Sequence, residues 1–141
     1  MIVINGENLI VGRAATFAAK KALLGETINI VNCEKMYLTG SKEYLFKEGK
    51  RRRDQGTWSK GPIYFRMPDR FVRRIIRGML PHKTARGKDA FARVMCYVGV
   101  PEKYKNEKMI TLDNASIKNI PNLRYLSVEE LTKHLGAKWN Q

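Results

Sequence analysis

The stretch MIVINGENLIVGRAATFAAKKALLGETINIVN, residues 1–32, decides the fold of this chain. Residues 2–4 are a run of Ile and Val without polar alternation, which is typical of a strand covered on both faces. From Val11 onward, alanines and other apolar residues recur at helical spacing, and Gly25 follows as a helix C-cap. Residues 27–32 form a second strand pattern. A strand, a helix and a strand in this length predict a right-handed βαβ unit and therefore a parallel sheet.

Residues 68–79 predict a helix with two chemically opposite faces. Pro68 suits the first turn, where its missing N–H costs little, and the Asp69 carboxylate favours the positive end of the helix dipole. Apolar side chains at positions 71, 72, 75, 76 and 79 share one face. The spacing i, i+3, i+4 and i+7 places four guanidinium groups on the other face: Arg70, Arg73, Arg74 and Arg77. This basic face is suited to contact successive phosphates.

Caps and breakers predict further elements. Ser41 can cap a helix that runs to about Lys50, after which Gly and Pro residues indicate a loop. Residues 83–88 are expected to be a basic connection, followed by a short helix from 89 to 93 and a buried strand from 94 to 98.

Two sequence patterns mark the start of the last predicted helix. Ser127 and Glu130 form a capping-box pattern, and Leu126 and Leu131 occupy the two hydrophobic-staple positions. This helix should run from about Val128 to Leu135 and stop at the following glycine.

The composition favours a single domain, residues 1–141, around one core. A chain of 141 residues with 43% hydrophobic content has the commonest domain size. Cys33 and Cys96 are far apart, and no Cys-x-x-Cys pair accompanies them, so we expect buried reduced thiols and no metal site.

No membrane partner is expected. No apolar run approaches the ~20 residues of a spanning helix, and the first ten residues lack the basic start of a signal peptide. We therefore expect a soluble, cytoplasmic protein.

The positive charge is concentrated in one third of the chain. The net charge is +14 and the pI is near 10.0. Residues 48–93 hold 14 of the 27 Lys and Arg but only 4 of the 13 Asp and Glu. Like charges on one compact segment repel unless an anion neutralises them, which indicates a nucleic-acid partner. Beside the four helix arginines, the candidate RNA-binding residues of this segment are Arg51, Arg52, Arg53, Arg66, Lys83, Arg86, Lys88 and Arg93.

Three aromatic side chains lie among these basic residues: Trp58, Tyr64 and Phe65. Such rings can stack on unpaired RNA bases, but packing in the core or an interface also explains them. We favour packing.

The sequence does not match the motifs of nucleotide-binding or catalytic sites. Gly40-Ser41-Lys42 lacks the upstream glycine of a phosphate-binding P-loop and is followed by Glu43. The stretch from residue 5 to 12 has no G-x-G-x-x-G, and His82 has no nucleophile or acid at catalytic spacing. We therefore predict no catalytic residue, no cofactor and no small-molecule substrate.

The stretch IRGMLPHKTARG, residues 76–87, followed by Ala90-Phe91 and by VMCYVG at 94–99, closely resembles the signature region of the large-subunit ribosomal protein family L13. The resemblance continues through the opening strand and other short matches, and so covers most of the chain. His82-Lys83-Thr84 and the basic residues 51–53 are similar to the archaeal and eukaryotic branch.

This resemblance implies a three-layer α/β/α fold around a mainly parallel four-stranded sheet. It also implies a structural role in the ribosome, bound to large-subunit rRNA early in assembly and next to other large-subunit proteins. Among the basic residues, it supports Arg77, Lys83 and Arg86 as RNA contacts, whereas the others rest on charge alone.

Two alternatives stand beside this role. A free-standing regulator would bind a short, defined nucleic-acid sequence through the same face, and a nucleotide-dependent enzyme would bind ATP or NAD without RNA. The ribosomal interpretation predicts that charge reversal at Arg73, Arg74 and Arg77 abolishes incorporation into large subunits and leaves the isolated fold intact.

Overall fold

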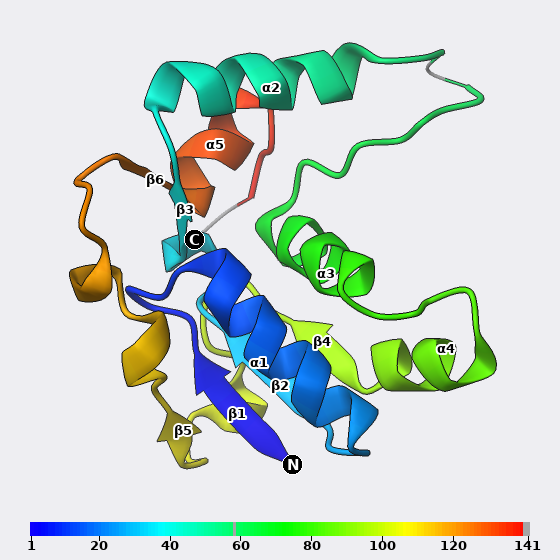
Figure 1. Cartoon of the computed structure of the whole chain (residues 1–141), viewed down its shortest axis with the longest axis vertical. Coiled ribbons are helices and arrows are strands. Elements are labelled where there is room, and N and C mark those ends of the chain that lie inside the picture. The colour runs from blue at the N-terminus through cyan, green and yellow to red at the C-terminus, as the bar shows by residue number, and fades with distance from the viewer. Residues whose placement is uncertain (58, 140–141) are drawn as a thin grey trace.

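The computed structural model describes residues 1–57 and 59–139. Within these residues, four parallel strands form the central sheet, in the order β4-β2-β1-β5 (Figure 1). The strands are β1 (Ile2–Asn5), β2 (Ile28–Val31), β4 (Val94–Cys96) and β5 (Met109–Ile110). Helix α1 (Val11–Leu23) joins β1 to β2, and Ile2 pairs with Ile28. The predicted βαβ unit is confirmed.

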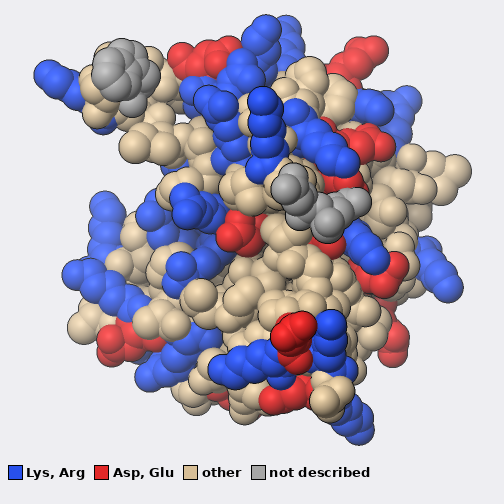
Figure 2. All heavy atoms as spheres, turned by 180° about the vertical axis from the view of Figure 1, so that it is seen from behind, with Lys and Arg blue, Asp and Glu red and all other residues tan. Residues whose placement is uncertain are grey.

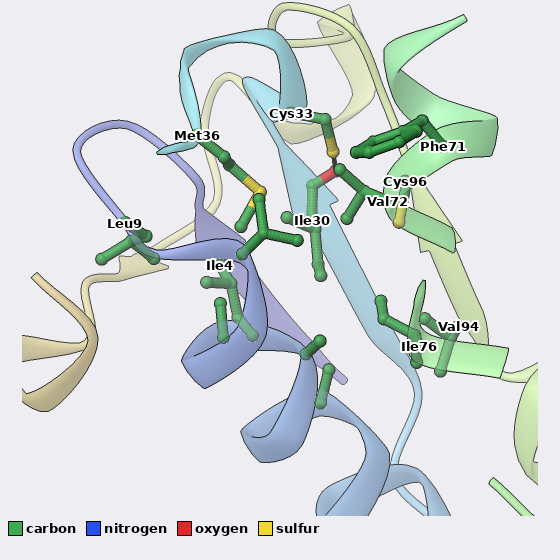
Figure 3. Packing of buried hydrophobic residues seen from close by; sticks show 14 of the residues in the cluster. Ile4, Leu9, Ile30, Cys33, Met36, Phe71, Val72, Ile76, Val94 and Cys96 are labelled. Carbon is green, nitrogen blue, oxygen red and sulfur yellow. Dashed lines mark hydrogen bonds between the residues drawn. The ribbon is translucent and has the colours of Figure 1, made fainter. Parts of the chain in front are cut away.

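Helices α1, α3 (Pro68–Gly78) and α4 (Ala85–Ala92) cover one face of the sheet (Figure 1). The five buried alanines of α1 leave room for the helix to pack closely, since their side chains are small. Figure 3 shows side chains of β2, β4 and α3 meeting in this core. The buried residues that it labels include Ile4, Ile30, Val72, Ile76 and Val94.

The opposite face of the sheet is covered by the chain that follows β4. Val3 and Val31 pack there against Tyr104, which belongs to the 3-10 helix η2 (Glu102–Tyr104). The structure therefore confirms an α/β fold around a parallel four-stranded sheet. The third layer consists of η2 and its flanking segment.

A second, smaller sheet carries two more helices. Strands β3 (Tyr37–Thr39) and β6 (Tyr125–Ser127) pair antiparallel, and α2 (Lys42–Asp54) and α5 (Val128–His134) pack beside them (Figure 1). Buried Leu126 and Leu131 belong to the same hydrophobic cluster as Ile4 of the central sheet. The two sheets thus share one core.

The basic helices begin or end differently from the prediction. Helix α2 extends past Lys50 to Asp54, and the Ser41 side chain makes no capping hydrogen bond. Helix α4 starts at Ala85, so the predicted connection over residues 83–88 is wrong from that point on. The physical reason is a local cap, because the Thr84 hydroxyl accepts a hydrogen bond from the Gly87 N–H at 3.2 Å.

The C-terminal prediction is confirmed. The Ser127 hydroxyl accepts from the Glu130 N–H at 3.1 Å, and the helix ends before Gly136, whose φ is 88°. The strand expected over 94–98 is shorter and stops at Cys96. Sequence reasoning missed β3, β5, β6 and the short 3-10 helices η1 (Cys33–Lys35), η3 (Asp113–Ala115) and η4 (Ile117–Asn119).

Both cysteines are buried and free, as predicted. Burial raises the pKa of the Cys33 thiol well above its usual value, with a further rise from neighbouring Cys96. No helix in the described part of the chain has the length and apolar content needed to cross a membrane. Across residues 1–57 and 59–139, no group of three or more His, Cys, Asp or Glu is placed to hold a metal ion.

Candidate nucleic-acid interface

The arginine face of α3 lines a pocket. Its opposite face, with Phe71, Val72 and Ile76, is buried in the core, so the arginines point outward from the helix. The pocket has a volume of about 290 Å³ and is lined by Phe65, Arg70, Arg73, Arg74, Arg77 and Phe91. The structure therefore brings together the four arginines that helical spacing placed on one face.

Two of these arginines are held by the protein itself. Arg73 is half-buried, donates from Nε to the Val94 carbonyl oxygen at 2.9 Å, and lies with its guanidinium carbon 4.4 Å from the Phe91 ring centroid. Arg74, also half-buried, donates from Nη1 to the Ile63 carbonyl oxygen at 2.6 Å. Their positive charges are therefore fixed in place before any ligand arrives.

The other two arginines of α3 are free to bind a ligand. Arg70 and Arg77 are exposed, and neither has a hydrogen bond or ion pair with any residue that the structure describes. Arg70 lies with its guanidinium carbon 5.9 Å from the Phe65 ring centroid. Planar, unpaired guanidinium groups at such a surface are suited to bidentate contact with phosphate.

Helix α2 adds a second basic cluster. Glu48 accepts hydrogen bonds from Arg51 at 2.8 Å and from Arg52 at 2.7 Å, and these bonds lower the pKa of the Glu48 carboxyl to about 2. Arg53 instead binds Asp54 and donates to the Leu135 carbonyl oxygen at 3.4 Å. Glu48 thus orients two of the three predicted arginines.

The α2 and α3 clusters meet. Arg51 and Arg52 share a hollow of about 250 Å³ with Arg74 of α3 and with Tyr64 of the connecting segment. Guanidinium groups that are more than 20 positions apart in sequence therefore line the same hollow.

The remaining predicted residues divide into two groups. Arg93 is half-buried and donates to the Ala22 carbonyl oxygen at 3.4 Å, so it satisfies the C-terminal end of α1. Four of the predicted residues are exposed: Arg66, Lys83, Arg86 and Lys88. Exposure suits these four for phosphate contact.

Figure 2 shows Lys and Arg gathered around a hollow in the outline of the molecule. The hollow lies between the segment that joins α2 to α3, which projects in Figure 1, and the part of the molecule that carries α4. A concave, positively charged surface of this kind focuses the electrostatic field on a polyanion.

The aromatic residues do not behave alike. Tyr64 is half-buried and packs edge-on against Phe71, with 6.2 Å between ring centroids, and burial raises the pKa of its hydroxyl. Packing is therefore the role of Tyr64. The Phe65 side chain lies at the surface, 36% exposed, and the prediction for Trp58 falls outside the described residues.

Sequence reasoning missed two residues of this surface. Glu48 was detectable, because it lies three and four positions before Arg51 and Arg52, the spacing of helical ion pairs. Phe91 carried no such signal, since only the packing of α4 beside α3 places its ring under Arg73.

A larger hollow lies elsewhere and lacks this chemistry. It has a volume of about 510 Å³ beside α1 and η3, and its one basic lining residue, Arg13, donates to the Asn114 carbonyl oxygen at 3.1 Å. Electrostatics therefore favours the smaller pocket on α3 as the nucleic-acid site.

Comparisons with known proteins identify the family of the chain. Residues 1–103 match the family model described as Ribosomal protein L13. The chain belongs to the ribosomal protein L13 family. Curated members named large ribosomal subunit protein uL13 are similar over nearly the whole chain.

Three relatives show the extent of this similarity. The protein of Methanococcus maripaludis is 44% identical over 144 residues, that of Methanosarcina barkeri 41% over 140, and that of Methanococcoides burtonii 40% over 139. Each alignment covers 99% of this chain and 100% of the relative. These archaeal L13 proteins agree with the branch indicated by the sequence motifs.

Proposed function

We propose that this chain is a structural component of the large ribosomal subunit and binds large-subunit rRNA through residues 48–93, without catalytic activity. The names of its relatives support the ribosomal role. The observation that carries the binding mode is the pocket in which four arginines of α3 meet. Such a cluster has no compensating acid among its lining residues, so an anion is its natural ligand.

The proposed contacts are of two kinds. Exposed Arg70, Arg77 and the lysines and arginines of α4 and its preceding turn neutralise phosphates, which gives most of the affinity but little sequence information. Arg73 and Arg74 have fixed positions, so they require the RNA backbone to fit a set geometry. Recognition would therefore depend on RNA shape more than on base sequence.

The cellular setting follows from this role. The protein would reside in the cytoplasm within the ribosome, join the large subunit early in assembly and contact neighbouring large-subunit proteins. Neither a cofactor nor a small-molecule substrate takes part in such a function.

Affinity-tagged recovery from gently lysed cells at moderate salt tests the proposal. We expect stoichiometric large-subunit rRNA in the large-subunit fractions after sedimentation. A light peak with other RNA would favour the regulator, and a light peak with bound nucleotide would favour the enzyme.

A matched pair of variants assigns the effect to the proposed surface. Arg77→Glu should abolish incorporation, because it reverses an exposed charge in the pocket. Lys105→Glu makes the same charge change at an exposed residue outside 48–93 and should be incorporated normally. Normal occupancy of subunits by a folded Arg77→Glu protein would contradict the proposed surface.

A further inference from the structure

The Phe65 side chain is a partly exposed aromatic ring in a pocket that four arginines also line. It is 36% exposed in the segment that joins α2 to α3. The guanidinium carbons of Arg70 and Arg74 lie 5.9 and 5.8 Å from its ring centroid. Tyr64, its neighbour, instead packs against Phe71. Two adjacent rings therefore have different roles, and only that of Phe65 is open to a ligand in this pocket.

The size of the pocket restricts what can enter. Its volume of about 290 Å³ lies just below the roughly 300–1,000 Å³ of pockets for drug-sized ligands. A single planar base fits such a space, whereas a base-paired helix is far too wide. A lone phosphate, for its part, would gain nothing from the aromatic walls.

The pocket also contains a second flat surface. Arg73 lies over the Phe91 ring, and its hydrogen bond to the Val94 carbonyl oxygen fixes the plane of the guanidinium group. Unpaired RNA bases stack on aromatic rings and on guanidinium planes alike. The pocket thus combines two stacking surfaces with exposed Arg70 and Arg77, which are available for the flanking phosphates.

From this geometry we infer that the pocket receives one unpaired RNA nucleotide, whose base stacks on Phe65 while Arg70 and Arg77 bind the phosphates on either side. The inference rests on the proposed function and specifies its ligand at one site. It gives Phe65 a contact with an RNA base, whereas the basic residues neutralise phosphate charge. An acidic side chain of a neighbouring protein is the competing occupant, and the test below distinguishes it.

The test measures binding of the full chain to deproteinised large-subunit rRNA over a range of salt concentrations. Phe65→Leu keeps an apolar side chain but removes the ring, so affinity should fall roughly 5- to 150-fold, the effect of losing one stacked base. The slope of log affinity against log salt should not change, because no cation is lost. Phe65→Trp should retain affinity, and Tyr125→Leu, at an exposed aromatic residue of β6 outside the pocket, should have no effect.

Ultraviolet irradiation of the wild-type complex, followed by mass spectrometry, gives an independent readout. We expect a nucleotide adduct on the peptide that contains Phe65, and its loss in Phe65→Leu. Unchanged affinity of Phe65→Leu without an adduct in the wild type would overturn the inference while the proposed function stands. Absence of rRNA binding by the wild type would instead reject the proposed function.

The competing occupant has its own signature. If Phe65→Leu binds protein-free rRNA as tightly as the wild type but is missing from assembled subunits, a neighbouring protein fills the pocket, and the inference is wrong.

Discussion

The Arg73 guanidinium carbon lies 4.4 Å from the centroid of the Phe91 ring, and Nε of the same side chain donates to the Val94 carbonyl oxygen at 2.9 Å. One side chain of α3 therefore holds both α4 and the start of β4. Helical spacing predicted the same role for Arg73 as for Arg70 and Arg77. Its contacts with Val94 and Phe91 show that it also stabilises the fold.

Replacing Arg73 should destabilise the isolated protein. Arg73→Ala removes a cation–π contact and a charged hydrogen bond, which together contribute roughly 1–3 kcal/mol at a half-buried site. Denaturant unfolding should show this loss, whereas Arg77→Ala, at an exposed residue without a described partner, should stay within about 0.5 kcal/mol of the wild type. Equal stability of the two variants would contradict this structural role of Arg73. Because of these contacts, we now expect charge reversal at Arg73 to destabilise the isolated fold, unlike charge reversal at Arg77.

The salt dependence of rRNA binding should distinguish arginines that contact phosphate from arginines that are hydrogen-bonded within the protein. Arg77→Ala should reduce the magnitude of the slope of log affinity against log salt by roughly 0.7–0.9, the contribution of one phosphate contact. Arg93→Ala should leave the slope unchanged, because Arg93 donates to the Ala22 carbonyl oxygen instead. Circular dichroism at the assay temperature checks that both variants are folded. The same slope for wild type and Arg77→Ala would remove Arg77 from the phosphate contacts.

The Glu48 carboxyl should titrate with a pKa of about 2, well below the ordinary 4.5, because Arg51 and Arg52 hydrogen-bond to its charged form. A lowered folded-state pKa means that the contribution of this cluster to stability is present above pH 4.5 and is lost as the pH falls towards 2. NMR titration of the side-chain carboxyl measures it.

Two changes should raise this pKa. In an Arg51→Ala/Arg52→Ala double variant, the midpoint should return towards 4.5. RNA binding should also raise it if phosphates compete with Glu48 for the two arginines. A midpoint near 4.5 in the free wild-type protein would show that the described cluster does not form in solution.

Gly87 should not tolerate a side chain. A Cβ at this position would collide with the Pro81 carbonyl oxygen, whereas a Cβ at Gly78 meets no atom within 4 Å. Gly87→Ala should therefore cost about 1–3 kcal/mol of stability through overpacking. Gly78→Ala should be neutral or stabilising by up to about 1 kcal/mol, since alanine favours the helix. Thermal unfolding compares the two, and an unaffected Gly87→Ala would mean that the turn before α4 can move aside.

Both thiols should be protected in the folded protein. Burial raises the pKa of the Cys33 thiol, and Cys96 is 6% exposed, so neither should react with a thiol-specific reagent at pH 8. Two equivalents of reagent should be consumed once denaturant unfolds the chain. Rapid reaction of the native protein would indicate an opening of the core between α3 and β2.

The sequence by itself determined the elements whose signals are local. The alternation of strand, helix and strand over residues 1–32, the two faces of α3, and the Ser127 cap of α5 each depend on side chains within a few positions of one another. Spacing and capping therefore predicted them. The βαβ unit predicted a parallel sheet, and the family resemblance implied that the sheet has four strands.

Only the tertiary structure decided how the basic residues are used. Helical spacing placed Arg73 and Arg77 on one face, but the carbonyl oxygen and the ring that hold Arg73 come from 21 and 18 positions further along the chain. Charge patterns contain no information about such acceptors, because a backbone carbonyl has no sequence signature. The pocket that contains Phe65 and Phe91 exists for the same reason: the fold brings one ring from the segment before α3 and one from α4 to the arginines of α3.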